Sequence, residues 1–341
     1  MKADGSLAAL GDGIRRVNRA PAVWLGAWAL TVLVSLPLAD AMRDRPARRF
    51  DASLAVNTAA SAVNDDWMRE LLSDATGLTA AFTPAVIGLG AALDSLGAIP
   101  DNDRQPVAIV GATAVYVAAW LFLAGGIIDR YARNHITRAH GFFAASGVFF
   151  FRFLRLAVAM GLTYGALFAV LHPWLFGRVL PRLTREMTGE QAAFVIRAFL
   201  YGVFGFALTS CNIVFDYAKV RAVVEDRRSM IGAMIAGIRF IRRNLAAAAG
   251  LYLMDVLLVA LVLAVYGLVA PGAGNAGWSM WLVVLLGQGY VAARLWVQLV
   301  FWASETALFQ SRLAHAGYVA TPAPMWPESP MAEAIGTHPL A

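Results

Sequence analysis

Six long apolar stretches constrain this chain more than any other feature of its sequence. They lie at approximately 21–38, 107–128, 149–171, 194–215, 245–270 and 280–303. A helix needs about 20 mostly apolar residues to cross roughly 30 Å of hydrocarbon. In lipid, every backbone polar group needs a partner within its own segment, which favours helices. Since the stretches do not alternate as barrel strands would, the sequence predicts an all-α polytopic membrane protein with six transmembrane helices.

The composition agrees with this prediction. The chain is 59% hydrophobic and 15% charged, whereas an average soluble domain is about half apolar and a quarter charged. This excludes a disordered chain, a nucleic-acid-binding domain and an ordinary cytosolic enzyme. The net charge of +6 is explained by arginines that flank the spans and face anionic headgroups. We therefore expect the lipid bilayer as the partner, with anionic headgroups at the cytoplasmic face, and no nucleic acid.

Six spans place both termini on one side of the membrane, and the segments on that side carry the excess of Lys and Arg. Such an excess marks the cytoplasmic side. The prediction is a multi-pass protein of the cell inner (cytoplasmic) membrane with both termini cytoplasmic. The basic leader, the first apolar stretch and Ala39-Asp40-Ala41 are also compatible with a signal peptide, so cleavage of the first span stays open.

The chain divides into a cytoplasmic amphipathic N-terminus (1–20), a six-helix membrane domain (21–320) and a disordered cytoplasmic tail (321–341). Within the membrane domain, residues 41–106 predict an external helical loop that packs over the bundle or forms a re-entrant segment or lid. Residues 218–244 predict one amphipathic cytoplasmic helix along the inner leaflet. Its alternative role is to dock an unknown membrane or cytoplasmic protein partner.

The chain also contains segments that resemble one another in sequence. Three segments that lead into outward helices begin with Gly and a branched aliphatic residue and contain arginine, at 13–19, 147–152 and 237–243. Inward helices end alike at 129–133 and 216–219, each from an Asp. This internal similarity predicts three tandem hairpins, each preceded by an amphipathic cytoplasmic helix. The alternative is that membrane helices with basic flanks resemble one another by chance. A repeat would favour retention of the first span.

These Gly-aliphatic-Arg turns, each followed by an apolar span, resemble those of bacterial six-helix integral membrane proteins. That group includes the membrane domain attached to some glycerophosphodiester phosphodiesterases and several uncharacterised families. Val63-Asn64-Asp65-Asp66-Trp67, Phe82-Thr83-Pro84 and Ala91-Ala92-Leu93-Asp94 resemble one of the latter. The resemblance implies architecture rather than catalysis. The phosphodiesterase activity belongs to a separate soluble domain, and no segment here has its length or its His/Glu constellation.

Polar side chains inside the spans are costly in lipid and indicate functional or packing roles. Those that share helix faces predict an intramembrane polar network of Asn212, Asp216, Asp255, Arg294, Gln298 and Glu305. Asp255 follows the start of the fifth span by about 15 Å, and Arg294 precedes the end of the sixth by about 14 Å. The depths predict an Asp255–Arg294 ion pair near mid-membrane. At the outer end of the third span, His172-Pro173-Trp174 predicts a helix stop.

No motif in the sequence indicates a reaction. A Walker-type phosphate loop, a His-Glu-x-x-His or Cys-x-x-Cys zinc motif and a Gly-x-Ser-x-Gly elbow are all absent. The single Cys211 excludes an intrachain disulfide. We therefore expect no catalytic residue, cofactor or metal, and a structural or accessory membrane protein that is not an enzyme. The alternatives are a channel or carrier with a polar cavity around Asp255 and Arg294, and a membrane-embedded enzyme acting on lipid.

Overall fold

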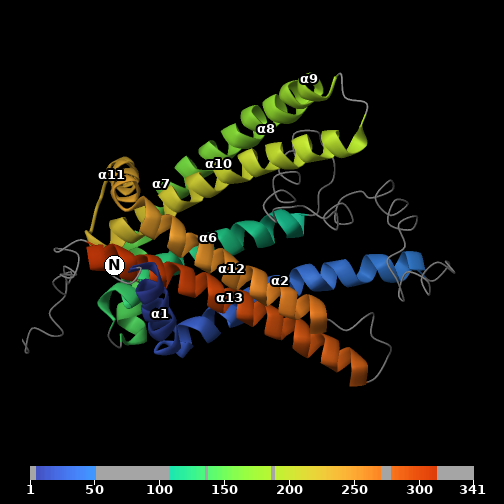
Figure 1. Cartoon of the computed structure of the whole chain (residues 1–341). Coiled ribbons are helices and arrows are strands. Elements are labelled where there is room, and N and C mark those ends of the chain that lie inside the picture. The colour runs from blue at the N-terminus through green and yellow to red at the C-terminus, as the bar shows by residue number, and fades with distance from the viewer. Residues whose placement is uncertain (1–4, 51–106, 135–136, 186–188, 270–277, 313–341) are drawn as a thin grey trace, which may run out of the picture.

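The computed structural model describes residues 5–50, 107–134, 137–185, 189–269 and 278–312, and every regular element in these ranges is helical (Figure 1). Five segments are long and apolar enough to cross a membrane, namely Ala114–Arg133, Ala139–Thr184, Gln191–Val224, Leu245–Val269 and Trp281–Arg312. A sixth is added if α1 and α2 together form one bent span. The expected all-α class, with five to six helices that could span a membrane, is confirmed.

Five of the six apolar stretches are shorter than the helical segments that contain them, and α12 matches its stretch. The helix bounds are α1 Gly5–Asn18, α2 Pro21–Phe50, α6 Val107–Arg133, α7 Ala139–Ala166, η2 Leu167–Leu171, α8 His172–Trp174, η3 Leu175–Val179, α9 Leu180–Thr184, α10 Glu190–Val224, α11 Met230–Arg243, α12 Leu245–Val269 and α13 Trp278–Arg312. Helices α10 and α13 have 35 residues each. At 1.5 Å per residue each is about 52 Å long, well beyond the hydrocarbon thickness. Apart from 245–270, the apolar stretches therefore locate the helices but are shorter than they are.

The helix stop expected at His172-Pro173-Trp174 is wrong. The helix continues from α7 through η2, α8 and η3 to the end of α9. Pro173 is the second residue of the short α8, which lies between two π-helical turns, η2 and η3. A π-helical turn tolerates the missing hydrogen bond and the ring of a proline without ending the helix. Rings at 168, 172 and 176, one turn apart, pack on α10, where Phe204 lies 5.2 Å from the His172 ring centroid.

Two further boundaries differ from the prediction. Helix α2 continues to Phe50, beyond the end of the first apolar stretch at 38 and into the segment predicted as an external helical loop. The rest of that loop, the tail 321–341 and the motifs between Val63 and Asp94 lie outside the described residues. The single helix predicted over 218–244 is two helices. Helix α10 runs to Val224, Asp226 takes a positive φ of 47°, and α11 starts after Ser229, whose side chain accepts a hydrogen bond from Gly232 N. A positive φ cannot continue a right-handed helix.

Helices α1 and α2 bend by 74° across the Asn18–Pro21 link. Pro21 favours the first position of a helix because it lacks an N–H group to donate. Beyond the bend, α2 pairs with α13. Trp24 Nε1 donates to Ala292 O at 2.8 Å, and Trp28 Nε1 donates to Gln288 Oε1 at 3.2 Å. The first predicted span is thus part of the packed bundle.

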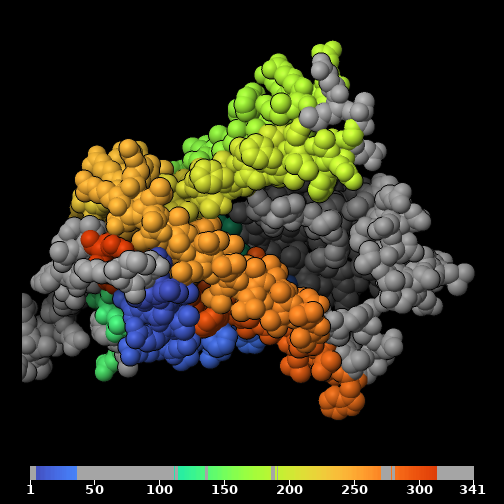
Figure 2. All heavy atoms as spheres, in the orientation of Figure 1, coloured from blue at the N-terminus to red at the C-terminus, as the bar shows by residue number. Residues whose placement is uncertain are grey.

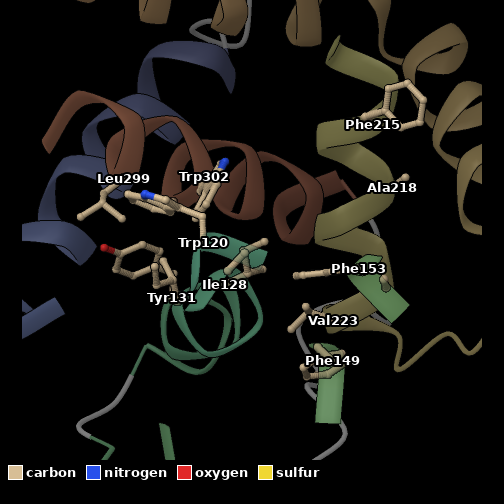
Figure 3. Close-up of a cluster of buried hydrophobic side chains, with 14 of the residues drawn as sticks. Trp120, Ile128, Tyr131, Phe149, Phe153, Phe215, Ala218, Val223, Leu299 and Trp302 are labelled. Atoms are coloured by element: carbon tan, nitrogen blue, oxygen red, sulfur yellow. The ribbon is translucent and has the colours of Figure 1, made fainter. Parts of the chain in front are cut away.

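Most of the buried core lies at one end of the bundle, which we call the packed end. It comprises α1, α11, the N-terminal half of α7 and the C-terminal turns of α6, α10 and α13 (Figure 1). Figure 3 shows part of its core, where Trp120 of α6 and Trp302 of α13 meet edge to face with ring centroids 5.7 Å apart. The hairpin formed by α7–α9 and α10 diverges from the remaining helices beyond this end; we call that part the splayed hairpin.

At the packed end, three pairs of helices are in extensive contact. Helix α1 packs on α13, α7 on α6, and α11 on α10. The first two contacts are very close. A Cβ on Gly13 would lie 2.7 Å from Ser304 N, and one on Gly126 would lie 2.7 Å from Phe142 O, beside Ser146. Ser146 thus contacts α6, whereas Gly147, the position singled out in the sequence, has open space.

Candidate functional site

Two of the predicted polar residues, Asn212 and Asp216, share one face of α10. Asn212 Nδ2 donates to Asp216 Oδ2 at 2.9 Å and to Tyr252 OH of α12 at 3.2 Å. Tyr164 OH of α7 donates to Asn212 Oδ1 at 3.3 Å. Asp216 also forms an ion pair with Lys219, whose Nζ lies 5.5 Å from the Trp302 ring. This chain of polar groups joins three helices that the sequence separates widely.

A second pair joins α12 to α13. Asp255 and Ser304 are both 0% exposed, and Ser304 Oγ donates to Asp255 Oδ2 at 3.2 Å. Phe301 O lies 2.9 Å from the same hydroxyl, so the two acceptors share its single hydrogen. Gly13 of α1 lies directly against Ser304, where no larger residue fits without displacement. Helix α1 thus covers this pair.

Glu305 lies beside both groups and is 2% exposed. Asp216, Asp255 and Lys219 are the charged groups close enough to act on its carboxyl. Among the described residues, Asp255 Oδ1, Glu305 Oε2 and Tyr217 OH are buried without a hydrogen-bond partner. A buried polar atom without a partner costs roughly 1–3 kcal/mol and is commonly satisfied by an ordered water. We call Asp216, Asp255, Ser304 and Glu305 the polar cluster.

The predicted ion pair between Asp255 and Arg294 is wrong. Within the described part of the chain, Asp255 is buried against Ser304, whereas Arg294 is exposed and forms no ion pair with it. Ser304 lies ten residues beyond Arg294, about 15 Å along the helix axis. The predicted depths place the inner end of the last span at Ala303, but α13 continues to Arg312. Gln298 is half-buried in α13, and Glu305 lies in the polar cluster.

Sequence inspection missed the charged group that ties α1 to the bundle. Arg16 is 9% exposed. It pairs with Asp12 at 2.7 Å and donates to Tyr131 O and Gln310 Oε1, both at 2.8 Å. Gln310 Nε2 donates to Ala132 O at 2.9 Å. Arg16 and Gln310 thus satisfy carbonyl groups at the C-terminus of α6, which its own backbone leaves free. An Asp and an Arg four residues apart signal a helical ion pair, but the partners on α6 and α13 are invisible in sequence.

The carboxyl, hydroxyl and amide groups of this site can bind protons, form hydrogen bonds and accommodate an ordered water. Their hydrogen bonds connect α7, α10, α12 and α13. Within the described ranges, no group of three or more His, Cys, Asp or Glu side chains is arranged to hold a metal ion. The Ser304 hydroxyl has a carboxyl partner but is fully buried. A nucleophile in that position has no access to a substrate in this conformation.

Comparisons with protein-family models, with curated proteins and with solved structures find no match to this chain.

Proposed function

We propose that this chain is a structural or accessory integral membrane protein without a catalytic site, in which the polar cluster fixes the relative positions of α10, α12 and α13. The observation that carries this proposal is the burial of Asp255, Ser304 and Glu305, with α1 packed directly against Ser304. A conduit or an active site needs an approach for its substrate, and these side chains are covered. Buried polar pairs of this kind can specify how helices register against one another.

The proposal includes three tandem hairpins in the inner membrane, with the packed end and both termini on the cytoplasmic side. A cyclic pattern of contacts supports the repeat. Arg16 of α1 reaches the end of α6, Arg152 of α7 pairs with Asp226 after α10, and Phe240 of α11 packs on Phe309 of α13. Each preceding helix thus contacts the end of a different inward helix. We further propose that the first span is retained, and that the relatives in architecture are the bacterial six-helix membrane proteins that the sequence resembles.

A double-mutant cycle on purified protein tests the structural role. Asp255→Ala and Ser304→Ala each remove one partner of the buried pair, and the double variant removes both. We expect a coupling free energy of about 1 kcal/mol, measured by denaturant titration in mixed micelles. Because either single change leaves a polar group unpaired or a cavity, the double variant should be less unstable than the sum of the singles. Strict additivity would contradict the proposal.

A carrier for protons or small cations is the second candidate. The unpartnered oxygens of Asp255 and Glu305 favour it, because ionisable groups within membrane spans commonly mark ion pathways. Flux into proteoliposomes under an imposed proton or potassium gradient separates the two candidates. If the role is structural, the flux with the wild type and with Asp255→Asn should equal the background flux of protein-free liposomes. A wild-type flux above that level, abolished by Asp255→Asn, would establish the carrier instead.

A further inference from the structure

Helix α11 has one face on the bundle and one that no described segment covers. Met230, Ala233, Gly237 and Phe240 are buried against the packed end. On the opposite face Ile231, Ile235 and Ile238 are 72%, 48% and 41% exposed. Their spacing of four and three residues places the three isoleucines in one stripe. We call these residues the isoleucine stripe.

Arginines without carboxylate partners adjoin this stripe. Arg239, Arg242 and Arg243 are exposed, and no ion pair involves them within the described ranges. Arg242 lies four residues after Ile238 and so extends the stripe by one turn. Nearby arginines differ, because Arg221 and Arg227 both pair with Glu225. The last turn of α11 therefore carries positive charge that the protein leaves uncompensated.

The position of α11 suits a membrane surface. Figure 1 shows that it crosses the ends of the neighbouring helices instead of continuing along them, and Figure 2 shows it as a protruding corner of the described part. Leu245, which begins α12 directly after α11, is itself largely exposed. A helix across the end of a bundle lies near the headgroup layer, where apolar side chains enter the acyl region and cations meet phosphates.

We propose that α11 is a binding site for anionic phospholipid, in which the isoleucine stripe enters the leaflet and Arg239, Arg242 and Arg243 hold the headgroup phosphate. Guanidinium groups bind phosphate oxygens in a bidentate manner. A juxtamembrane arginine gains attraction from anionic lipid that it lacks with a zwitterionic lipid. A second copy of this chain fits the surface less well. In a two-fold contact through the stripe with the two helices parallel, the three arginines would face the same arginines of the other copy.

Lipid selectivity of the full-length protein in liposomes tests the proposal. The probes are spin-labelled phosphatidylglycerol and phosphatidylcholine, and the measurement is the fraction of each that the protein immobilises. We expect the wild type to prefer phosphatidylglycerol by about threefold or more. Arg242→Gln/Arg243→Gln should lose most of this preference. The matched control, Arg178→Gln/Arg182→Gln, removes the same charge from exposed positions at the far end of the splayed hairpin. This variant should keep the preference for phosphatidylglycerol. Equal preference in the wild type and both double variants would overturn the proposal.

A nitroxide on Ile235→Cys, in a Cys211→Ser background, reports on the environment of the stripe. Lipid insertion predicts more frequent collisions with oxygen than with a water-soluble nickel chelate. Preferential collisions with the chelate would place the stripe in water. An immobilised label that neither reagent reaches would indicate a covering protein or a second copy. Either outcome would overturn the proposal.

Discussion

The packed end and the splayed hairpin have similar helices but are held together in different ways. At the packed end, backbones approach closely, as at Gly13 and Ser304, and buried polar groups such as Arg16 bridge three helices. In the splayed hairpin, α7–α9 and α10 meet mainly through apolar and aromatic side chains around Leu175, Leu200 and Phe204. Lipid tails are as apolar as these side chains and offer little driving force for helix association, whereas close packing and hydrogen bonds do. The difference predicts that stability resides at the packed end.

The largest effect is expected at Arg16. Replacement by Met keeps most of the apolar stem but removes the donor to Tyr131 O and Gln310 Oε1, together with one of the two arginines that pair with Asp12. Loss of these bonds should lower the free energy of unfolding by about 3 kcal/mol, measured by denaturant titration in mixed micelles. The control is Arg15→Met, which removes an exposed pair with the same Asp12 and should cost under about 1 kcal/mol. Similar losses at the two positions would remove the proposed role of Arg16.

A smaller loss is expected from Gly13→Ala. The added methyl group would lie under 3 Å from the backbone of Ser304, so α1 must shift on α13 at a cost of about 1–3 kcal/mol. On the same helix, a Cβ at Gly11 meets nothing within 4 Å. Gly11→Ala should therefore stabilise α1 slightly, by up to about 1 kcal/mol. Thermal unfolding of the two variants side by side measures the difference. A stable Gly13→Ala variant would refute the close contact.

The smallest effect on the whole molecule is expected in the splayed hairpin. Phe204 is buried against the rings of Phe168 and His172, while Phe206 faces outward. Phe204→Ala should loosen the hairpin and cost about 1 kcal/mol of global stability, since lipid replaces part of the lost contact. Hydrogen exchange should rise in α8–α10 and stay unchanged in α6 and α13, whereas Phe206→Ala should change neither. Increased exchange at the packed end would show that the two regions unfold as one.

The comparison also explains what the sequence could predict. Apolar stretches locate the helices because lipid imposes length and composition on each one separately. Helix ends are less constrained. Helix α13 continues through the polar residues after Ala303. The partner of Asp255 is therefore Ser304 and not the predicted Arg294. Face-sharing correctly grouped Asn212 with Asp216. Partners such as Tyr164 and Gln310 come from the way the helices pack, which no single-helix pattern contains.

In the proposed structural role, the polar cluster is closed to bulk water. Thiol labelling of Ser304→Cys in intact membranes, in a Cys211→Ser background, tests it most directly. The matched control is Ser311→Cys, seven residues further along α13 and exposed. If the cluster is closed, a membrane-permeant maleimide labels residue 311 rapidly and residue 304 only after denaturation. Comparable labelling of both residues in the folded protein would show that water reaches the polar cluster, which would contradict the proposed structural role.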